Sequence, residues 1–394
     1  MLSVSDADRI LAGVLPGAET ESVPLAQAAG RCLSAPVTAD RDGPPFDRVA
    51  MDGYAVWSAS GLRQWTVRGF QAAGQPPVRA EDPSVAVEVA TGAVLPARCD
   101  AVVPYEHTTR EGDRVILRPD HGLPVAGRHV HHRGTDYRQG QTLFPVGTVL
   151  HSTHLHTLAS VGLDPVPVLR RPVWSLAVTG DELTEVAASP EAWQIRRSNA
   201  AAIAGEARAW GLGPRDEAVL PDDADALRVG LEHLVPGLDV LVLTGGVSAG
   251  ALDLVPGVMA ALGAEVLFHK IAQRPGKPLW CGRIPAREGS RATLVFGLPG
   301  NPVSSLFSFR RFVLPWLLAA EGRTVPVRRL AVPGLEAPTK GQTAFLPWSQ
   351  TTGLLDWRGS GDYLALASSS GFLEVDDDPR SLVEPKYYPW GGVW

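Results

Sequence analysis

Between residues 173 and 320, short apolar runs alternate with stretches in which apolar positions recur at helical spacing. The runs are VWSLAVT, DVLVLT, AEVLFHKIA and TLVFGL, and they have the length and β-branched content of buried strands. Strands that alternate with helices are typical of parallel βα units, so this region is predicted to form an open α/β sheet. In such sheets the ligand lies at the loops that follow the strands.

The helices of this region are predicted from the stretches between the runs. One opens near Ser198-Asn199, and two others span Asp223 to Val235 and Asp253 to Leu262. A fourth helix is predicted to begin after Asn301, which would be its N-cap. Pro302 would take the first helical position, where the missing N–H of proline breaks no hydrogen bond. These helices complete the expected alternation.

The regions on either side have a different pattern. Residues 41 to 139 are rich in Gly and Pro, with short runs such as VAVEVA (85–90) and RVILRP (114–119), which predicts a compact β domain. From about residue 324 onward, short apolar runs between turn residues predict a small β-barrel. The stretch HSTHLHTLASVGL is predicted to be a helix that joins the first β region to the α/β region. The expected fold class is therefore a multidomain combination of α/β and β parts.

Length and charge narrow the classes of function. A chain of 394 residues exceeds one ordinary core, so roughly two to four domains are expected. A net charge of -6 gives no general attraction to nucleic acid or to an anionic membrane.

The cysteines and the apolar segments narrow the expected location. The three cysteines, Cys32, Cys99 and Cys281, have neither a disulfide pattern nor a zinc spacing. The N-terminal stretch is acidic, unlike a signal peptide, and Phe312 to Ala320 contains Pro315 and is too short to span a bilayer. We expect a cytoplasmic protein with neither a membrane nor a nucleic-acid partner.

Two turns in the first β region carry candidate chemical groups. In PPFDRVAMDGYAV (44–56), Asp52 precedes Gly53, which permits a tight turn, so the carboxylate is held at a surface. In VEVATGAVLPARCDAVVPYE (87–106), an alternating strand ends at Thr91-Gly92, where a hydroxyl and backbone amides can meet an anion. Each residue alone is also consistent with an ordinary turn.

Three loops after predicted strands have the composition of anion-binding loops. VTGDEL (178–183) offers the carboxylates Asp181 and Glu182. TGGVSAGALD (244–253) offers a glycine-rich anion nest, and GLPGNPVSS (297–305) offers backbone amides at a helix N-terminus. The candidate substrate-binding residues of the last two loops are Gly245, Gly246, Ser248, Gly300, Asn301 and Pro302, and Asp253 adds a carboxylate at a helix start.

A cationic turn lies between two of these loops. HKIAQRPGKP (269–278) brings Lys270, Arg274 and Lys277 together around a Pro-Gly turn, in a chain whose other lysines are Lys340 and Lys386. Carboxylates near phosphate loops and cations indicate a magnesium-assisted reaction on a phosphate or another oxyanion. The alternative from the residues alone is a solvated set of turns on a structural sheet.

Taken in order, these motifs resemble one known family. They are AMDGYAV, TGA-V-LP, RGTD, TGDEL, SN, GGVSAGALD, RPGKP and GLPGNPVS. The set is similar to that of the MoeA family, which includes the E domain of gephyrin and plant homologues. The resemblance covers roughly residues 20 to 320 and is looser in the C-terminal region. Several long motifs in the same order argue against coincidence.

The resemblance implies an enzyme of molybdenum-cofactor synthesis. It would take adenylylated molybdopterin and molybdate, with Mg²⁺, and release molybdenum cofactor and AMP. Besides the small pterin substrate, the implied partners are a second copy in a homodimer, a molybdopterin adenylyltransferase and molybdoenzymes. The implied domains are a linking domain (21–40 and 140–163), a β-rich domain (41–139), an α/β molybdopterin-binding domain (1–20 and 164–323) and a C-terminal β-barrel (324–394).

Residue roles follow from the same motifs. Molybdate is a dianion, so cations and hydrogen-bond donors must replace its water, and cleaving an adenylate bond needs a metal ion that neutralises phosphate oxygens. The implied metal supports are Glu182, Asp222 and Asp253. The implied catalytic residues are Asp52, Thr91, Asp136, Glu182, Asp222 and Asp253, and the implied molybdate-binding residues are Lys270, Arg274, Lys277 and Ser360.

One departure from the family's pattern introduces histidines. The segment before Gly134, which usually carries several arginines, reads GRHVHHRGTD with His129, His131 and His132. Imidazoles replace permanent charges with titratable ones, so anionic substrate is expected to bind more tightly as the pH falls. A metal site is the alternative, but the segment lacks a supporting carboxylate or cysteine set.

The remaining departures concern charge near the expected molybdate site. Arg196-Arg197 stands where relatives often have Asp before the Ser-Asn pair, and Arg274 replaces a lysine with its charge retained. Gln342 aligns with an arginine that relatives use near molybdate, whereas the family's Gly-Ser pair is present at Gly359-Ser360. The resemblance therefore supports the pterin site more firmly than the molybdate site.

Two other functions remain open. One is molybdopterin adenylyltransferase activity of the α/β domain alone, but the motifs matched outside that domain argue against it. The other is a non-catalytic dimeric scaffold of the same family, and the retained carboxylates count against that interpretation.

Overall fold

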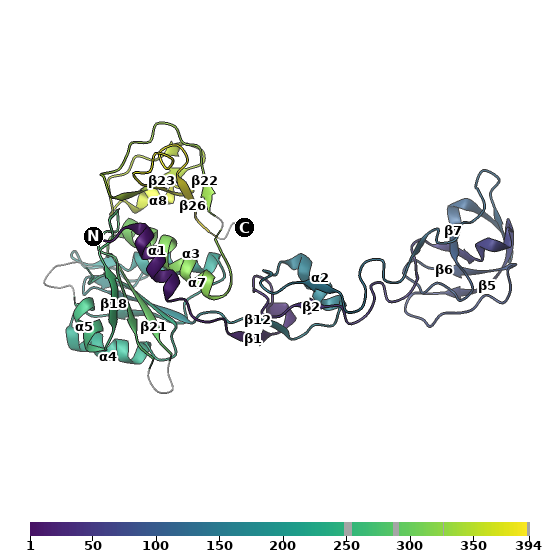
Figure 1. Cartoon of the computed structure of the whole chain (residues 1–394), viewed down its shortest axis with the longest axis horizontal. Helices are drawn as coiled ribbons and strands as arrows, with labels where there is room; N and C mark the ends of the chain where they lie inside the picture. Colours follow the sequence, from purple (N-terminus) through teal and green to yellow (C-terminus); the bar gives the residue numbers. More distant parts are fainter. Residues whose placement is uncertain (248–253, 287–290, 326, 392–394) are drawn as a thin grey trace. The chain divides into compact units, whose positions relative to one another are not determined.

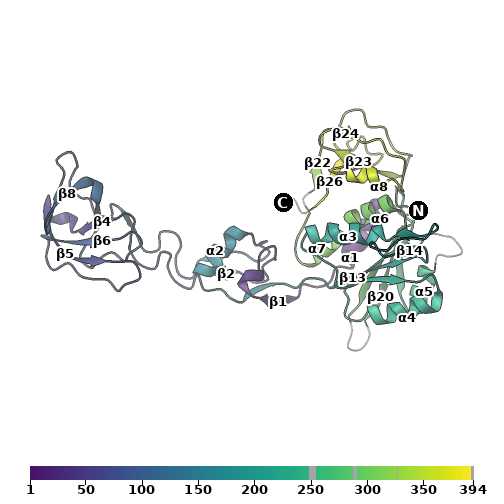
Figure 2. The same cartoon turned by 180° about the vertical axis from the view of Figure 1, so that it is seen from behind.

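The chain is divided into two compact units. A computed structural model describes residues 1–247, 254–286, 291–325 and 327–391. The first unit comprises Met1–Glu21, Gly30–Cys32 and Leu169–Trp394, and the second comprises Ser22–Ala29 and Leu33–Val168. Figures 1 and 2 show both units from opposite sides. The finer division into four domains stays a prediction.

The first unit contains a six-stranded sheet with the order β16-β13-β17-β21-β20-β18. The first four strands in this order are parallel, and β20 and β18 are antiparallel to their neighbours. Every residue of β13, β17 and β21 is buried, which explains their continuous apolar runs. The predicted α/β sheet is confirmed. Its strands are β13 (Trp174–Thr179), β16 (Glu217–Leu220), β17 (Val240–Thr244), β18 (Glu265–His269), β20 (Trp280–Ile284) and β21 (Thr293–Leu298).

Helices cover both faces of this sheet. Helices α1, α3, α6 and α7 share one apolar core with the sheet, and α4 and α5 share the other, as the opposite sides of the sheet in Figure 1 show. The helix starts predicted at Ser198 and Asp223 are confirmed, because Ser198 opens α3 and the side chain of Asp223 caps α4 by accepting from the Ala226 N–H. The start predicted at Asp253 lies outside the described residues. These helices are α1 (Val4–Gly13), α3 (Ser198–Ala209), α4 (Ala224–Leu234), α5 (Val255–Ala261), α6 (Pro302–Ser308) and α7 (Leu314–Ala320).

One continuous helical segment, Pro302–Ala320, runs through the centre of the first unit. It comprises α6, the π-helical turn η4 (Phe309–Val313) and α7. With 19 residues and a mean hydropathy of 1.2 it is long and apolar enough to cross a membrane, but 78% of it is buried inside the protein. It is therefore a core helix, and it is longer than the apolar run Phe312 to Ala320 that the sequence pattern picked out.

The C-terminal region of the first unit forms a second sheet with the order β19-β23-β25-β26-β22, and β24 pairs with β23. Strand β19 comes from the α/β region and pairs with β23 in parallel, so the two sheets share a connection. The described hydrogen-bonded order does not close on itself, so the predicted barrel is not confirmed. The elements are β19 (Gln273–Arg274), β22 (Arg328–Arg329), β23 (Thr343–Ser349), β24 (Gly353–Leu354), β25 (Gly371–Val375), β26 (Lys386–Pro389) and α8 (Tyr363–Ala367).

The second unit contains a six-stranded sheet with the order β7-β4-β6-β5-β9-β8. Short strands and mainly apolar inner faces give this sheet two small cores. The β-rich character predicted for this region is confirmed. The strands are β4 (Gly53–Val56), β5 (Gln64–Gln71), β6 (Val85–Val89), β7 (Ala101–Pro104), β8 (Thr108–Glu111) and β9 (Arg114–Leu117).

Smaller elements complete the chain. The predicted connecting helix is present as α2 (Ser152–Ser160), whose N-terminus is capped by His151 and His154. Single 3-10 turns are η1 (Leu25–Gln27), η2 (Ser58–Ser60) and η3 (Tyr105–His107). The two-stranded pairs are β1 (Thr20–Val23) with β12 (Val166–Leu169), β2 (Val37–Thr38) with β11 (Thr142–Phe144), β3 (Arg48–Val49) with β10 (Val130–His131), and β14 (Leu183–Thr184) with β15 (Ile195–Arg196).

Candidate active site

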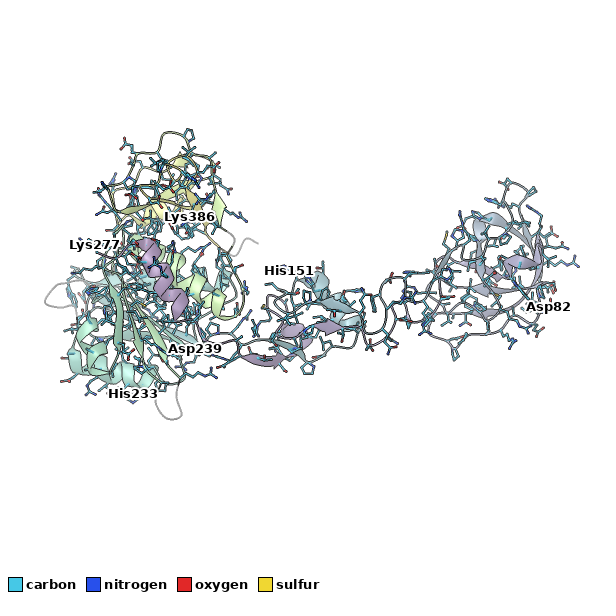
Figure 3. The ribbon with its side chains drawn as sticks, viewed as in Figure 1. Asp82, His151, His233, Asp239, Lys277 and Lys386 are labelled. Atoms are coloured by element: carbon cyan, nitrogen blue, oxygen red, sulfur yellow. The ribbon has the colours of Figure 1, made fainter. Side chains whose placement is uncertain are left out.

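A large cleft in the first unit lies at the ends of the parallel strands, where the α/β sheet meets the C-terminal sheet. Its volume is about 1820 Å³. The lining residues come from the ends of β13, β17 and β21, from the turn after β19, and from the C-terminal region. Figure 3 shows Lys277 at this meeting of the two sheets. The residues expected from the sequence that line the cleft are Glu182, Asp222, Gly245, Gly246, Arg274, Lys277, Gly300, Asn301, Pro302 and Ser360.

At the floor of the cleft, the backbone at Gly245 lies close to the backbone at Thr179. Gly245 has a φ of 99°, and a Cβ at this position would lie 2.7 Å from the Thr179 carbonyl oxygen, so glycine is required. The Thr179 hydroxyl is buried and has no hydrogen-bond partner among the described residues. Asn199 Nδ2 donates to the Gly300 carbonyl oxygen at 2.7 Å and thereby holds the loop after β21. These contacts fix the loops after β17 and β21 at the floor of the cleft.

The cationic turn that carries Arg274 and Lys277 is fixed by hydrogen bonds of the buried Gln273. Gln273 is buried, and its Nε2 donates to the Gly276 carbonyl oxygen at 3.0 Å and to Ser308 Oγ at 3.4 Å. The flanking Arg274 and Lys277 side chains are exposed at the cleft, and neither forms a hydrogen bond or ion pair with another described residue. Two cations on a fixed turn are therefore available to an anion.

A hydroxyl from the C-terminal region faces the same cleft. Asn301 Nδ2 donates to Ser360 Oγ at 2.9 Å, and the Val303 N–H donates to the Ser360 carbonyl oxygen at 3.1 Å. Because Ser360 Oγ accepts from Asn301, its own hydrogen is free to donate to an oxyanion. The expected N-cap role of Asn301 is confirmed by position, but its side chain bonds to Ser360 and makes no cap hydrogen bond.

Sequence reasoning missed one further cation at this cleft, which Arg196 and Arg197 also line. Arg358 lines it two residues before Ser360, and its guanidinium forms no hydrogen bond or ion pair within the described part of the chain. Gln342, which aligns with the arginine of relatives, also lines the cleft. The only available signal was the position of Arg358 beside the Gly359-Ser360 pair.

Two carboxylates approach the cleft from the loops after β13 and β16. Asp181 Oδ1 accepts from the Asp222 N–H at 3.1 Å, which holds the two loops together, and Glu182 and Asp222 line the cleft. No group of three or more His, Cys, Asp and Glu side chains among the described residues could hold a metal ion. Mg²⁺ commonly uses one or two carboxylates together with substrate phosphates, and Glu182 and Asp222 are residues at this cleft that could supply such ligands.

Other expected residues are not part of this described site. Ser248 and Asp253 lie outside the described residues. Lys270 is not among the residues that line the cleft; it has a left-handed φ of 68°, and its N–H donates to the Leu279 carbonyl oxygen at 2.9 Å. Its role in molybdate binding stays a prediction.

The remaining candidates, Asp52, Thr91 and Asp136, belong to the second unit. Asp52 Oδ1 accepts from the backbone N–H of Thr91 at 2.6 Å and from Thr91 Oγ1 at 2.8 Å. These two hydrogen bonds, with the backbone one dominant, hold the pKa of Asp52 below its ordinary value. The two candidates, named separately from the sequence, therefore form a carboxylate–hydroxyl pair in which Thr91 holds Asp52. Their catalytic role stays a prediction.

Comparisons with known proteins agree over nearly the whole chain. Two family models match it, "MoeA N-terminal region (domain I and II)" over residues 2–162 and "Probable molybdopterin binding domain" over residues 175–319. Molybdopterin molybdenumtransferase from Synechocystis sp. is 33% identical over 99% of both chains, and molybdopterin molybdenumtransferase 2 from Mycobacterium tuberculosis is 31% identical over 96% of both. A solved structure of the molybdopterin biosynthesis MoeA protein from Pyrococcus horikosii has a TM-score of 0.79 at 28% identity and full coverage of both chains.

Proposed function

Because this chain belongs to the MoeA family, we propose that it inserts molybdenum into molybdopterin during synthesis of the molybdenum cofactor. The substrates in this proposal are adenylylated molybdopterin and molybdate, and the products are molybdenum cofactor and AMP. The observation that carries it is the group of cations without ion-pair partners at the end of an α/β sheet, beside a serine hydroxyl that is free to donate.

The proposed molybdate site combines charge with a hydrogen-bond donor. Arg274, Lys277 and Arg358 supply positive charge from two segments that are far apart in the sequence, and Ser360 donates its hydroxyl hydrogen. A dianion that leaves water for this cleft needs such groups in place of its hydration shell. We assign to Arg358 the charge that relatives supply with an arginine at the position of Gln342.

The proposed pterin site uses the glycine-rich floor of the cleft. Gly245, Gly246 and Gly300 line this floor and, having no side chains, let the phosphate end of the substrate approach the backbone closely. Glu182 and Asp222 would hold Mg²⁺, and we extend this set to Asp253. An ion held by these carboxylates would supply positive charge to neutralise the phosphate oxygens at the adenylate bond. Asp52, Thr91 and Asp136 complete the proposed catalytic residues.

The proposal extends to partners and location. We infer a homodimer, a cytoplasmic location, and contact with a molybdopterin adenylyltransferase and with molybdoenzymes that receive the product. These inferences rest on the family. They are independent of the cleft geometry.

The direct test supplies purified protein with adenylylated molybdopterin, Mg²⁺ and molybdate, and follows AMP release and cofactor formation. The proposal expects AMP release that depends on molybdate. Formation of adenylylated molybdopterin from ATP and molybdopterin would instead support the adenylyltransferase alternative. Dimerisation without turnover in either assay would support the scaffold.

Lys277→Ala is expected to weaken the use of molybdate more than the binding of the pterin substrate. A charge-assisted hydrogen bond contributes roughly 1.5–3 kcal/mol, so the apparent molybdate constant should rise roughly 10- to 100-fold. The measurement is that constant at saturating adenylylated molybdopterin. Arg358→Ala should shift the same constant in the same direction.

The matched control is Lys340→Ala, because Lys340 is an exposed lysine that does not line the cleft. Its molybdate constant should equal that of the unmodified chain. An unchanged constant in the Lys277 variant would show that this lysine serves another purpose.

A further inference from the structure

Three side chains of the second unit form a hydrogen-bonded line that ends at Asp136. Strands β3 and β10 pair antiparallel, with Arg48 directly opposite His131. Arg48 Nη2 lies 3.0 Å from His131 Nδ1, and His131 Nε2 lies 2.9 Å from Asp136 Oδ1. The imidazole therefore joins the guanidinium to the carboxylate.

The chemistry of the three groups fixes the proton on the imidazole. A guanidinium can only donate, so His131 Nδ1 must accept the hydrogen bond from Arg48. In a neutral imidazole with Nδ1 as acceptor, the proton lies on Nε2, which then donates to Asp136 Oδ1. A proton on Nδ1 would place two donors face to face, so Arg48 would have to move away first.

The surrounding charged groups are engaged with one another. His132 Nδ1 lies 3.4 Å from Asp47 Oδ1, which also accepts from the Arg133 N–H at 2.8 Å. Arg133 Nε donates to Asp42 Oδ2 at 2.8 Å. The Asp136 backbone N–H donates to the Gly43 carbonyl oxygen at 2.8 Å, so the carboxylate is anchored through its backbone and through one oxygen. Asp136 Oδ2 has no hydrogen bond to a described residue and remains available.

We propose that Arg48 and His131 are positioning residues for Asp136, with His131 acting as a neutral Nε2–H donor whose tautomer Arg48 imposes. The proposal rests on the proposed catalytic role of Asp136. It differs from the expectation that His131 supplies part of an arginine's charge to an anionic substrate. In this geometry the charge stays on Arg48, and the imidazole transmits its orientation to the carboxylate.

The first test is NMR of the full chain with ¹⁵N-labelled histidine, which distinguishes the two tautomers and the charged ring. At pH 7.5, His131 is expected as the Nε2–H tautomer, and Arg48→Met is expected to remove that preference. His154 is an internal reference, because its Nδ1 accepts from the His151 N–H at 2.9 Å, so it should be the Nε2–H tautomer in both proteins. A charged or Nδ1–H form of His131 in the unmodified chain would overturn the proposal.

The second test is turnover. Arg48→Met and His131→Ala should each lower kcat on the order of 10-fold, as for groups that orient a functional side chain, with a smaller change in KM. Arg48→Lys, which keeps a charged donor, should recover part of the loss. Arg68→Met, which removes an exposed arginine 3.6 Å from Asp113 in the same unit, should leave kcat unchanged.

The two tests separate this proposal from the one on which it rests. Unchanged kcat in the Arg48 and His131 variants, with reduced kcat in Asp136→Asn, would refute positioning and leave the role of Asp136 in place. Full activity of Asp136→Asn would refute its catalytic role and the positioning proposal with it. The NMR result would then still report the tautomer.

Discussion

Asp52→Asn is expected to lower turnover by about 10²- to 10⁴-fold while the protein keeps its fold. Asp52 Oδ1 accepts two hydrogen bonds from Thr91, and the carboxamide oxygen of asparagine can accept both. The turn therefore stays in place, and only the negative charge is lost. The measurement is molybdate-dependent AMP release, with thermal unfolding of the same preparation as the check on the fold.

Asp82→Asn is the matched control for this substitution. Asp82 is exposed in the same unit (Figure 3), and its Oδ1 accepts from the Ser84 N–H at 2.8 Å and from Ser84 Oγ at 2.5 Å. As in Asp52, one carboxylate oxygen accepts from both the backbone N–H and the hydroxyl of one residue, but no function is proposed for Asp82, so near-normal turnover is expected. Equal losses in the two variants would point to loop integrity, and normal turnover in the Asp52 variant would remove Asp52 from the catalytic residues.

The pH dependence of turnover tests whether protonation of Asp52 limits activity near neutral pH. Hydrogen bonds from Thr91 lower the pKa of Asp52 from the ordinary value of 3.8. A group with a lowered pKa keeps its charge as the pH falls, until the pH passes below that value. Loss of turnover between pH 8 and 5 must therefore be assigned to other groups.

Glu374→Gln is expected to lower the free energy of unfolding by about 3–5 kcal/mol, the typical cost of removing one partner from a buried ion pair. Glu374 is buried, and it accepts from Arg311 Nε at 2.5 Å, from Lys386 Nζ at 2.8 Å and from the Tyr388 hydroxyl at 2.8 Å. Arg311 also forms a bidentate pair with Asp8. The variant would leave the Arg311 charge with less compensation in the core. Denaturant unfolding of the full chain measures the change.

The same network predicts a loss of stability in acid. Burial alone would raise the pKa of Glu374, but the charges and hydrogen bonds of Arg311 and Lys386 outweigh it and lower the pKa from 4.5 to about 2. The carboxylate therefore contributes stability above pH 4.5, and this contribution is lost as the pH falls toward 2. The Glu374→Gln variant should lack this part of the acid dependence.

Two further variants make the stability experiment interpretable. Glu232→Gln removes an exposed partner of Arg228 at 2.8 Å, which should change the free energy of unfolding by less than about 1 kcal/mol. Tyr388→Phe removes one hydrogen bond to Glu374 and should cost about 1 kcal/mol. A Glu374 variant as stable as the Glu232 variant would show that the buried pair contributes little.

The α/β part of the fold could be predicted because local signals and tertiary burial agree there. The runs that became β13, β17 and β21 are mostly apolar and are buried along their whole length, as expected for strands covered on both faces. The cap at Asp223 and the proline at position 302 marked helix starts that the structure contains. Asp52 and Thr91 were singled out separately, through the glycine that follows each and through the family motifs, and only the structure shows the hydrogen bonds between them.

The rest depends on contacts between segments that are remote in the sequence. The bond between Asn301 and Ser360 joins a helix start to the C-terminal region, and Arg358 reaches the cleft through that arrangement. No sequence pattern predicted that Arg310 and Arg311 would be buried inside an apolar helix, because their ion-pair partners lie on other elements. For the same reason the sequence indicated short strands after residue 324 but could not establish how they pair.

Strand β19 has a thermodynamic consequence. It is the segment from which the Arg274 and Lys277 turn departs, and its Gln273 and Arg274 pair with Thr343 and Ala344 of β23. Local opening of β23 would remove the pairing that orders this turn. An anion that binds only the ordered turn stabilises the closed state and therefore makes the opening of β23 less frequent. The backbone amides of β23 would therefore exchange with solvent deuterium more slowly when molybdate is bound, which makes the C-terminal sheet a remote reporter of occupancy at the cleft.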